Sequence, residues 1–246
     1  MKILITGAAG FLGRHLVAGL ESEHELTLTD LPTAKGFGIG NLPWHECDVA
    51  DFQVVSGLVE GHDAVVHTVA LVRGRAGLPI ERFVDVVVKG TWNVAEASAR
   101  AGVRRLINIS SVAAGGWPIS TDHPMQASER HPFSAKDLHY SLSKWLGECI
   151  VNAYGEAYPT MAILNIRPGV IAGDGENPGP SKVDAPFWFS YVDVHDVVGA
   201  ILESLKKSDA PRGTYAIVAG RADALFDWES AATDLGYVSD NTWPAL

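Results

Sequence analysis

Hydrophobic residues recur in two alternating patterns along the chain. Short apolar runs, typical of strands buried on both faces, alternate with longer stretches in which apolar residues recur every three or four positions, typical of amphipathic helices. The predicted strands are Lys2–Thr6, Glu25–Thr29, Asp63–His67, Arg105–Ile109, Ala162–Ile166 and Thr214–Val218, with a short strand near Trp44–Cys47. The predicted helices are Gly10–Leu20, Asp51–Val59, Ile80–Ala101, Leu138–Ala157, Val194–Lys207 and Leu225–Leu235.

This alternation predicts an α/β fold of the Rossmann type. Strands that are apolar on both faces and separated by helices form a parallel sheet covered on both sides, here a doubly wound one. No internal repeat or interdomain linker is visible, so we expect one domain over residues 1–246. Its core would cover about residues 1–165, and a smaller portion, about 166–246, would be interleaved with it. Two loop-like stretches, Gly115–Pro132 and Gly173–Trp188, are long enough to be functional.

Composition narrows the class of protein. A chain of 246 residues, 47% hydrophobic and 20% charged, is long enough to bury a substantial core. Its formal charge of −10 is spread along the sequence, which disfavours nucleic acid or an anionic membrane as a partner. Cys47 and Cys149 suggest neither a disulfide framework nor a metal site. The first apolar run ends at Gly7, too early for a signal peptide or a spanning helix, so we expect a soluble, cytoplasmic protein that acts on a small molecule.

A glycine-rich turn follows the first predicted strand and opens the first predicted helix. Gly7 permits the tight turn, Gly10 lets the backbone approach a pyrophosphate, and Gly13 allows close packing of helix on sheet. The N-terminus of the helix then offers N–H groups and a partial positive charge to the phosphates. A glycine triplet alone also fits an ordinary turn, but the strand–turn–helix context favours a dinucleotide site.

Acidic residues end the next two predicted strands. Asp30 lies where a carboxylate accepts hydrogen bonds from the adenosine ribose and repels a 2′-phosphate, which favours NAD over NADP. The alternative is a turn aspartate before Leu31. Asp48 and Val49 are positioned to hold the adenine edge, although Asp48 also fits a helix cap.

Tyr140 and Lys144 carry the sharpest chemical signal. On a helix, positions four apart share a face, so the phenol and the ammonium would lie together. A free tyrosine, with a pKa of about 10, is a poor base at neutral pH, but a neighbouring ammonium and a positive nicotinamide favour the phenolate. Ser110 and Ser111 directly follow a predicted strand, at the carboxyl edge of the sheet, where such folds bind ligands. By itself, a Tyr/Lys pair also fits a solvated helix face.

Together these motifs resemble the extended short-chain dehydrogenase/reductase superfamily, the NAD-dependent epimerase/dehydratase family. The resemblance covers nearly the whole chain and includes Gly90-Thr91-x-Asn93, Arg167-Pro168-Gly169 and Tyr191-Val192-x-Val194-x-Asp196. It implies that Ser111 orients the substrate oxygen, that Tyr140 is the acid/base, and that Lys144 binds the nicotinamide ribose and lowers the Tyr140 pKa. The cofactor-binding residues that the motifs and the resemblance together imply are Gly7, Ala9, Gly10, Phe11, Leu12, Gly13, Asp30, Asp48, Val49, Ala70, Ser110, Tyr140, Lys144 and Pro168.

The chain departs from the family pattern at Val87, where the family usually has asparagine, so Asn93 is not interpreted as catalytic. His195 and Asp196, at the start of a predicted helix, are interpreted as capping and hydrogen-bonding residues. His67 is interpreted as packed structure rather than as a proton carrier.

The compact layout is similar to the uronate dehydrogenase branch of the family, because only about eighteen residues separate Gly173 from the Tyr191 motif. Nucleotide-sugar epimerases carry a longer insertion there. That branch surrounds its acidic sugar with polar side chains, whereas this chain has apolar residues at the corresponding positions, which predicts a less polar substrate. The predicted substrate-binding residues are Val72, Arg73, Val112, Ala113 and Val170.

We therefore expect an NAD-dependent oxidoreductase that transfers hydride between nicotinamide and a secondary alcohol or carbonyl of a sugar, sugar acid or similar hydroxy compound. Two alternatives remain open: a sugar or nucleotide-sugar 4-epimerase that retains its NAD, and a non-catalytic NAD-sensing module. The resemblance also implies a homodimer paired through Ile80–Ala101 and Leu138–Ala157.

Overall fold

A seven-stranded parallel sheet forms the centre of the computed structural model, which describes residues 1–34, 41–72, 77–117, 122–173 and 190–240. The strand order is β3-β2-β1-β4-β5-β6-β9, the order of a dinucleotide-binding Rossmann sheet. Its strands are β1 (Lys2–Thr6), β2 (Glu25–Asp30), β3 (Trp44–Glu46), β4 (Ala64–His67), β5 (Arg105–Ile109), β6 (Ala162–Pro168) and β9 (Gly213–Ile217). The predicted doubly wound α/β fold is confirmed.

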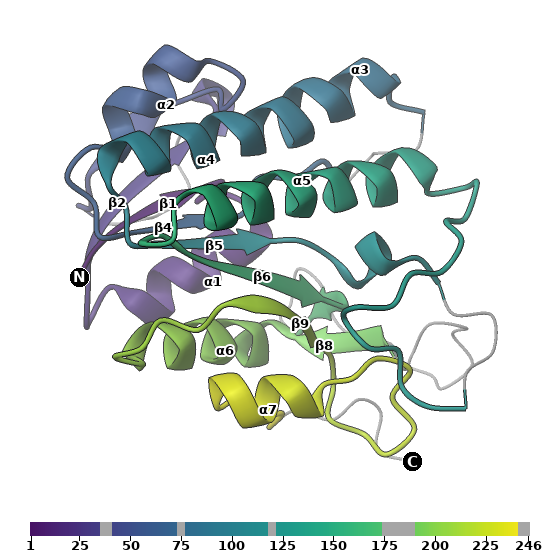
Figure 1. The fold of residues 1–246 in the computed structure, drawn as a ribbon. Helices are drawn as coiled ribbons and strands as arrows, with labels where there is room; N and C mark the ends of the chain where they lie inside the picture. The colour runs from purple at the N-terminus through teal and green to yellow at the C-terminus, as the bar shows by residue number, and fades with distance from the viewer. Residues whose placement is uncertain (35–40, 73–76, 118–121, 174–189, 241–246) are drawn as a thin grey trace.

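Helices cover both faces of the sheet (Figure 1). One face carries α1 (Phe11–Leu20), α6 (Val194–Lys206) and α7 (Glu229–Leu235). The other carries α2 (Phe52–Val59), α4 (Gly90–Ala101) and α5 (Leu138–Ala157), with α3 (Ile80–Phe83) and a π-helical segment, η2 (Val84–Lys89), leading into α4. The short 3-10 segments η1 (Pro32–Ala34) and η3 (Val112–Gly115) follow β2 and β5.

The core lies in two layers because successive residues of a strand point to opposite faces. On β1, Ile3 and Ile5 pack with α1 and α6, whereas Leu4 packs with α2, α4 and α5. All three are at most 1% exposed, and burying one such side chain stabilises the fold by roughly 1.5–3 kcal/mol. The apolar runs in the sequence are therefore strands with no solvent face.

One row of polar side chains crosses the sheet. Thr6, His67, Asn108, Asn165 and Thr214 are register partners on successive strands, so their side chains lie on one face. All are buried except Thr214, which is half-buried. The Asn165 side-chain oxygen accepts a hydrogen bond from Asn108 Nδ2 at 2.8 Å, and Asn165 Nδ2 donates to Thr214 Oγ1 at 3.3 Å. This row links neighbouring strands, and at one end of it Thr6 and His67 are the last residues of β1 and β4.

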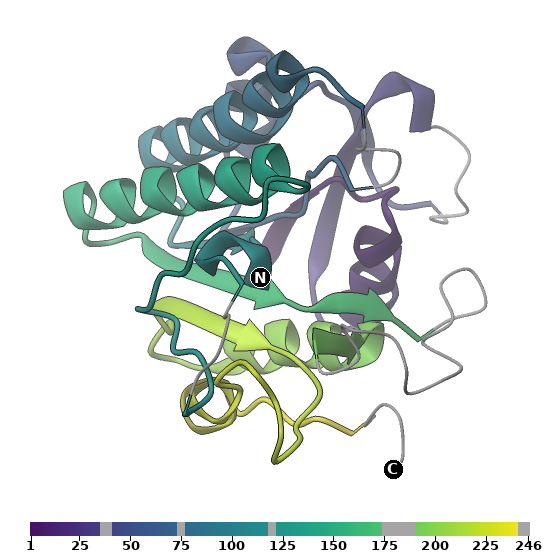
Figure 2. The same cartoon turned by 90° about the vertical axis from the view of Figure 1, so that its right-hand side faces the viewer.

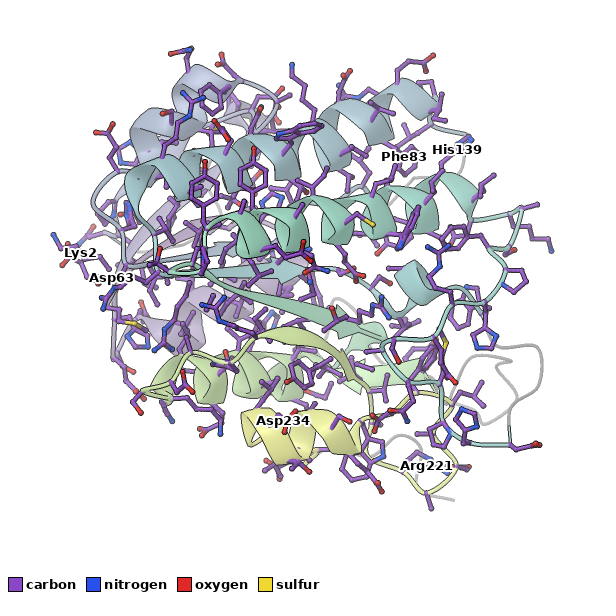
Figure 3. The ribbon with its side chains drawn as sticks, in the orientation of Figure 1. Lys2, Asp63, Phe83, His139, Arg221 and Asp234 are labelled. Atoms are coloured by element: carbon purple, nitrogen blue, oxygen red, sulfur yellow. The ribbon has the colours of Figure 1, made fainter. Side chains whose placement is uncertain are left out.

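The amino ends and the carboxyl ends of the parallel strands lie on opposite sides of the sheet, and we refer to these sides as the amino edge and the carboxyl edge. At the amino edge, Asp63 accepts hydrogen bonds from the Lys2 backbone N–H at 2.9 Å and from Arg104 at 2.7 Å; Lys2 and Asp63 are labelled in Figure 3. The carboxyl edge lies at the opposite end of the strands and is turned toward the viewer in Figure 2. The turn that follows β1 and η3, which follows β5, both lie at this second edge.

Two expected helices differ in the structure, and two strands are additional. The predicted helix Ile80–Ala101 is interrupted by the π-helical segment η2. The helix predicted from Leu225 begins instead at Glu229, because Phe226 pairs with Met125 in an isolated β-bridge and is buried. Two short paired strands, β7 (Val170–Ala172) and β8 (Tyr191–Asp193), were not expected.

Candidate active site

The turn after β1 has the geometry that a pyrophosphate needs. Gly7 has a φ of +74°, and a Cβ there would lie 2.5 Å from Thr68 Oγ1. A Cβ on Gly13 would overlap the Gly7 carbonyl oxygen and lie 2.8 Å from the Cα of Ala8. The turn is therefore closed so tightly that neither position has room for a side chain, as the sequence predicts.

Helix α1 presents its N-terminus at this turn. Gly10 is the N-cap, no side chain caps the helix, and its first turn carries no acidic residue. Its first N–H groups have no partner within the helix and carry the positive end of its dipole, so they are suited to bind an anion. The turn lies between β1 and β4, at the point where strand order reverses and Rossmann folds bind dinucleotides.

Asp30, at the end of β2, lies against the same turn. Its Oδ2 accepts a hydrogen bond from the Ala9 N–H at 2.9 Å, and its Oδ1 accepts one from the Leu31 N–H at 2.8 Å. Each carboxylate oxygen keeps a further lone pair, which matches the two hydroxyls of a ribose. The carboxylate thus stabilises the turn that follows β1.

Asp48 and Val49 follow β3. Asp48 is exposed, and its Oδ1 accepts a hydrogen bond from the Ala50 N–H at 2.9 Å. The N-cap of α2 is Asp51 rather than Asp48, so the alternative capping role of Asp48 is wrong. Val49 is buried, and its carbonyl oxygen accepts a hydrogen bond from Asn93 Nδ2 at 2.8 Å, which gives Asn93 a structural role.

Lys144 reaches from α5 to the end of β5. Its Nζ donates a hydrogen bond to the Ile109 carbonyl oxygen at 2.6 Å, and the side chain is 5% exposed. Burial lowers the Lys144 pKa to about 8. Tyr140 lies one helical turn earlier on the same helix and is half-buried.

Both predicted serines follow Ile109 directly. Ser111 is the N-cap of η3, and its Oγ accepts a hydrogen bond from the Ala113 N–H at 3.2 Å. The Ser110 hydroxyl is buried and, among the described residues, has no hydrogen-bond partner. Since α5 packs against η3, the structure brings the Ser110/Ser111 segment and Lys144 to one edge of the sheet.

The predicted substrate-binding residues fall into two groups. Val72 and Val170 are 49% and 43% exposed. Val112 and Ala113 are each 3% exposed, and Val112 belongs to an apolar cluster with Met125, Ala216, Val218, Ala224 and Phe226. Of the remaining predictions, Ala70 is half-buried after β4, Pro168 is buried at the end of β6, and Arg73 lies outside the described residues.

Two buried polar groups near Lys144 were not predicted as parts of a site. Glu148, one turn after Lys144, forms an ion pair with Arg167. His67 has one ring nitrogen 2.7 Å from Thr6 Oγ1 and the other 3.2 Å from Thr91 Oγ1, and burial, together with the nearby Lys144 charge, lowers its pKa to about 3. The periodicity of Tyr140, Lys144 and Glu148 signals the first group, whereas the second depends on register that the sequence does not specify.

The residue that caps α6 is Asp193, so the predicted capping role of His195 and Asp196 is wrong. The Asp193 Oδ1 accepts a hydrogen bond from the His195 N–H at 2.8 Å. The His195 ring lies 2.9 Å from the same oxygen, and Asp196 is buried in the first turn.

A Rossmann sheet, a glycine turn and an uncapped helix N-terminus at the switch point define a dinucleotide-binding protein. Residues 3–188 match the model of the NAD dependent epimerase/dehydratase family. The chain belongs to this family, and the predicted family and its cofactor, NAD, are confirmed.

Several known proteins are similar to the chain. It is 31% identical to a uronate dehydrogenase of Pseudomonas putida over 245 residues, which cover 96% of this chain and 83% of that protein. It is 30% identical to an L-arabinose 1-dehydrogenase (NAD(P)(+)) of Haloferax volcanii, over 68% of this chain and 66% of that one. The solved uronate dehydrogenase of Agrobacterium tumefaciens superposes with a TM-score of 0.80 at 23% identity, covering 98% of this chain and 84% of that one.

No helix within the described ranges is long and apolar enough to cross a membrane.

Proposed function

We propose that the protein is an NAD-dependent dehydrogenase that oxidises a secondary alcohol of a sugar, a sugar acid or a similar small hydroxy compound. The observation that carries the proposal is the buried Lys144 ammonium, held 2.6 Å from the Ile109 carbonyl directly before Ser110 and Ser111, with Tyr140 one helical turn away. The similar uronate and L-arabinose dehydrogenases support a substrate of this class.

Tyr140, Ser111 and Lys144 have separate roles in the proposed reaction. When bound, NAD supplies the carbon that accepts the hydride. Tyr140, as the phenolate, removes the proton of the substrate hydroxyl while Ser111 holds that oxygen by a hydrogen bond. The Lys144 ammonium favours the phenolate, because a nearby positive charge lowers the pKa of a phenol. In reverse, Tyr140 returns the proton to the oxygen of the reduced carbonyl.

The turn after β1 and Asp30 would hold the cofactor. The N–H groups at the start of α1 would bind the pyrophosphate, and the Asp30 carboxylate would accept hydrogen bonds from the adenosine ribose. The buried Ser110 hydroxyl, which lacks a partner among the described residues, also supports a ligand at this edge.

The substrate is proposed to be less polar than a uronate. Val72 and Val170 follow β4 and β6 at the carboxyl edge, and both are exposed. A hydroxyl or carboxylate left unpaired against such side chains costs about 1–3 kcal/mol. Val112, directly after Ser111, belongs to a buried apolar cluster and so offers a substrate no polar partner either.

A substrate panel tests the proposal. Uronates, aldoses, and aryl and alkyl alcohols are each incubated with the purified protein and NAD or NADP, and cofactor reduction is followed by absorbance. We expect NADH to accumulate with at least one class. Interconversion of sugars without free NADH would favour the NAD-retaining 4-epimerase, and NAD binding without any turnover would favour a sensing module; either result contradicts the proposal.

We also propose a homodimer that pairs the segments Ile80–Ala101 (α3, η2 and α4) and Leu138–Ala157 (α5) across a two-fold axis. Large apolar side chains of these segments are exposed: Ile80 is 46%, Val84 48%, Trp92 55% and Leu138 40% exposed. Phe83 and His139 face each other where α3 meets the start of α5, with ring centroids 5.9 Å apart (Figure 3). Sedimentation equilibrium should give twice the 26.3 kDa chain mass, and a monomer at every concentration would contradict this proposal.

The chain is further proposed to be one domain, with a cofactor-binding core over about residues 1–165 and a substrate-binding portion over about 166–246, in the cytoplasm. Strand β9, from the C-terminal portion, pairs with β6 and completes the sheet, so the two parts share one core. Calorimetry should then show a single unfolding transition, and two separated transitions would contradict it. Cys47 and Cys149 are both free thiols, which suits a reducing compartment.

A further inference from the structure

A buried ion pair lies behind the candidate catalytic residues. Arg167 Nε donates to Glu148 Oε1 at 2.8 Å, and Arg167 Nη2 donates to Glu148 Oε2 at 2.7 Å. The two side chains are only 7% and 4% exposed. Such two-pronged pairing fixes both groups in one geometry, but burying two charges offsets much of the energy that their attraction returns. Stability alone therefore gives little reason to place this pair here.

The pair joins three segments of the site. Glu148 is one helical turn after Lys144 and two turns after Tyr140, so all three side chains lie along one face of α5. Arg167 directly precedes Pro168, at the end of β6. The remaining arm of Arg167, Nη1, donates to the Ala127 carbonyl at 3.1 Å, in the segment that follows η3.

The Glu148 carboxylate also acts on Lys144 electrostatically. Burial lowers the Lys144 pKa, and the negative charge of Glu148 raises it. His67 on β4 also interacts with the Lys144 charge, but its ring is neutral at ordinary pH, and Tyr140 lies one turn earlier on α5. The charged residues of α3, η2 and α4 are exposed or paired with one another: Glu81, Arg82, Asp85, Lys89, Glu96 and Arg100. Among the described residues, Glu148 is thus the anionic group that supports the ammonium.

We propose that Glu148 and Arg167 are positioning residues for the catalytic set. Glu148 keeps Lys144 protonated in its buried site, while Arg167 holds the Glu148 carboxylate in place and anchors the segment at Ala127 to the catalytic helix. The inference rests on the proposed function only for its effect on turnover; the link between Glu148 and Lys144 is a property of the protein by itself.

The first test reads Lys144 directly, without any substrate. The protein is labelled with ¹³C at lysine Cε, the Lys144 signal is assigned by its loss in Lys144→Met, and its pKa is measured by NMR titration. In Glu148→Gln we expect that pKa to fall by at least about one unit, because a negative charge one helical turn away is removed. Glu156→Gln is the matched control, since Glu156 is an exposed carboxylate two turns further along the same helix, and it should leave the pKa unchanged.

Glu148→Gln leaves Arg167 buried without its partner, which can prevent folding. A second variant therefore tests the same link without a buried unpaired charge. Glu148→Met with Arg167→Met removes both charges and keeps similar volume. The Lys144 pKa should fall in this double variant as well, though by less, because a more distant positive charge is also lost. A Lys144 pKa that moves by less than about 0.3 unit in every folded variant would overturn the proposal.

Kinetics with a substrate from the panel separate the two roles. In Glu148→Gln, the alkaline limb of the kcat profile should move to lower pH in step with the Lys144 pKa. Arg167→Lys keeps the charge opposite Glu148 but lacks the fork that also reaches Ala127, so KM should rise several-fold while the Lys144 pKa stays within about 0.3 unit. An unchanged KM in Arg167→Lys would refute the anchoring role. If no substrate is turned over, the proposed function fails, and the NMR titration still decides the role of Glu148.

Discussion

Replacing Gly13 by alanine should damage the cofactor site through backbone displacement alone. A Cβ at this position would overlap the Gly7 carbonyl oxygen and lie 2.8 Å from Ala8 Cα, which are main-chain atoms that no side-chain rotation can relieve. Alanine itself favours a helix by up to about 1 kcal/mol relative to glycine, but overpacking of this kind costs about 1–3 kcal/mol. The turn must therefore open, and the N–H groups at the start of α1 shift away from the pyrophosphate.

We expect Gly13→Ala to weaken NADH binding at least about tenfold, or about 1.4 kcal/mol, and to lower the melting temperature by about 2–4 °C for each kcal/mol of lost stability. Binding is measured by the fluorescence of NADH and unfolding by circular dichroism. Gly199→Ala is the matched control, because Gly199 lies within α6 and a Cβ there meets no atom within 4 Å. It should raise stability by up to about 1 kcal/mol and leave NADH binding unchanged. A folded Gly13→Ala protein with the affinity of the wild type would refute the reasoning.

Three further predictions follow from the buried polar groups and Asp30. His67 stays neutral in the folded protein down to its pKa of about 3, whereas the unfolded chain takes up the proton below about 6.5; its contribution is therefore complete above pH 6.5 and is lost as pH falls. Urea unfolding should show that the wild type loses about 2 kcal/mol more than His67→Gln between pH 7 and pH 5, and equal losses would contradict this. Asn165→Ala leaves Asn108 Nδ2 and the Asn152 side-chain oxygen without their 2.8 Å partners, so it should cost at least about 1–3 kcal/mol in the same assay; a loss below about 0.5 kcal/mol would show that these bonds contribute little. Asp30→Ser should narrow the preference for NAD over NADP in steady-state kinetics, because the carboxylate that repels a 2′-phosphate is gone; an unchanged ratio would place the selectivity elsewhere.

The sequence predicts the sheet well because its strands are buried on both faces. The apolar run that includes Ile3, Leu4 and Ile5 has no polar alternative, and each such run becomes a strand of the parallel sheet. The short strands β7 and β8 are not predicted, because they have three residues each and form only by pairing with each other. The sequence predicts the start of α7 too early, because Leu225 and Phe226 continue a helical apolar pattern. In the structure, Phe226 instead forms a β-bridge with Met125.

The candidate site shows the same division between local and tertiary information. The glycine turn and the Tyr140/Lys144 pair depend on spacing within one segment, which a sequence displays directly. The contact of Lys144 with the Ile109 carbonyl and the row from Thr6 to Thr214 depend on strand register and helix packing, which it does not. Val112 shows the same limit, because its place next to Ser111 is plain from the sequence, whereas its packing against Met125 and Phe226 is visible only in the structure.

The replacement of Tyr140 by phenylalanine tests the central claim most directly. With a substrate identified by the panel, turnover of NAD by Tyr140→Phe should fall by a factor of about 10² to 10⁴, because only the proton-transfer group is removed, while NADH affinity stays within about twofold of the wild type. Turnover equal to that of the wild type would contradict the assignment of Tyr140 as the acid/base and, with it, the proposed mechanism.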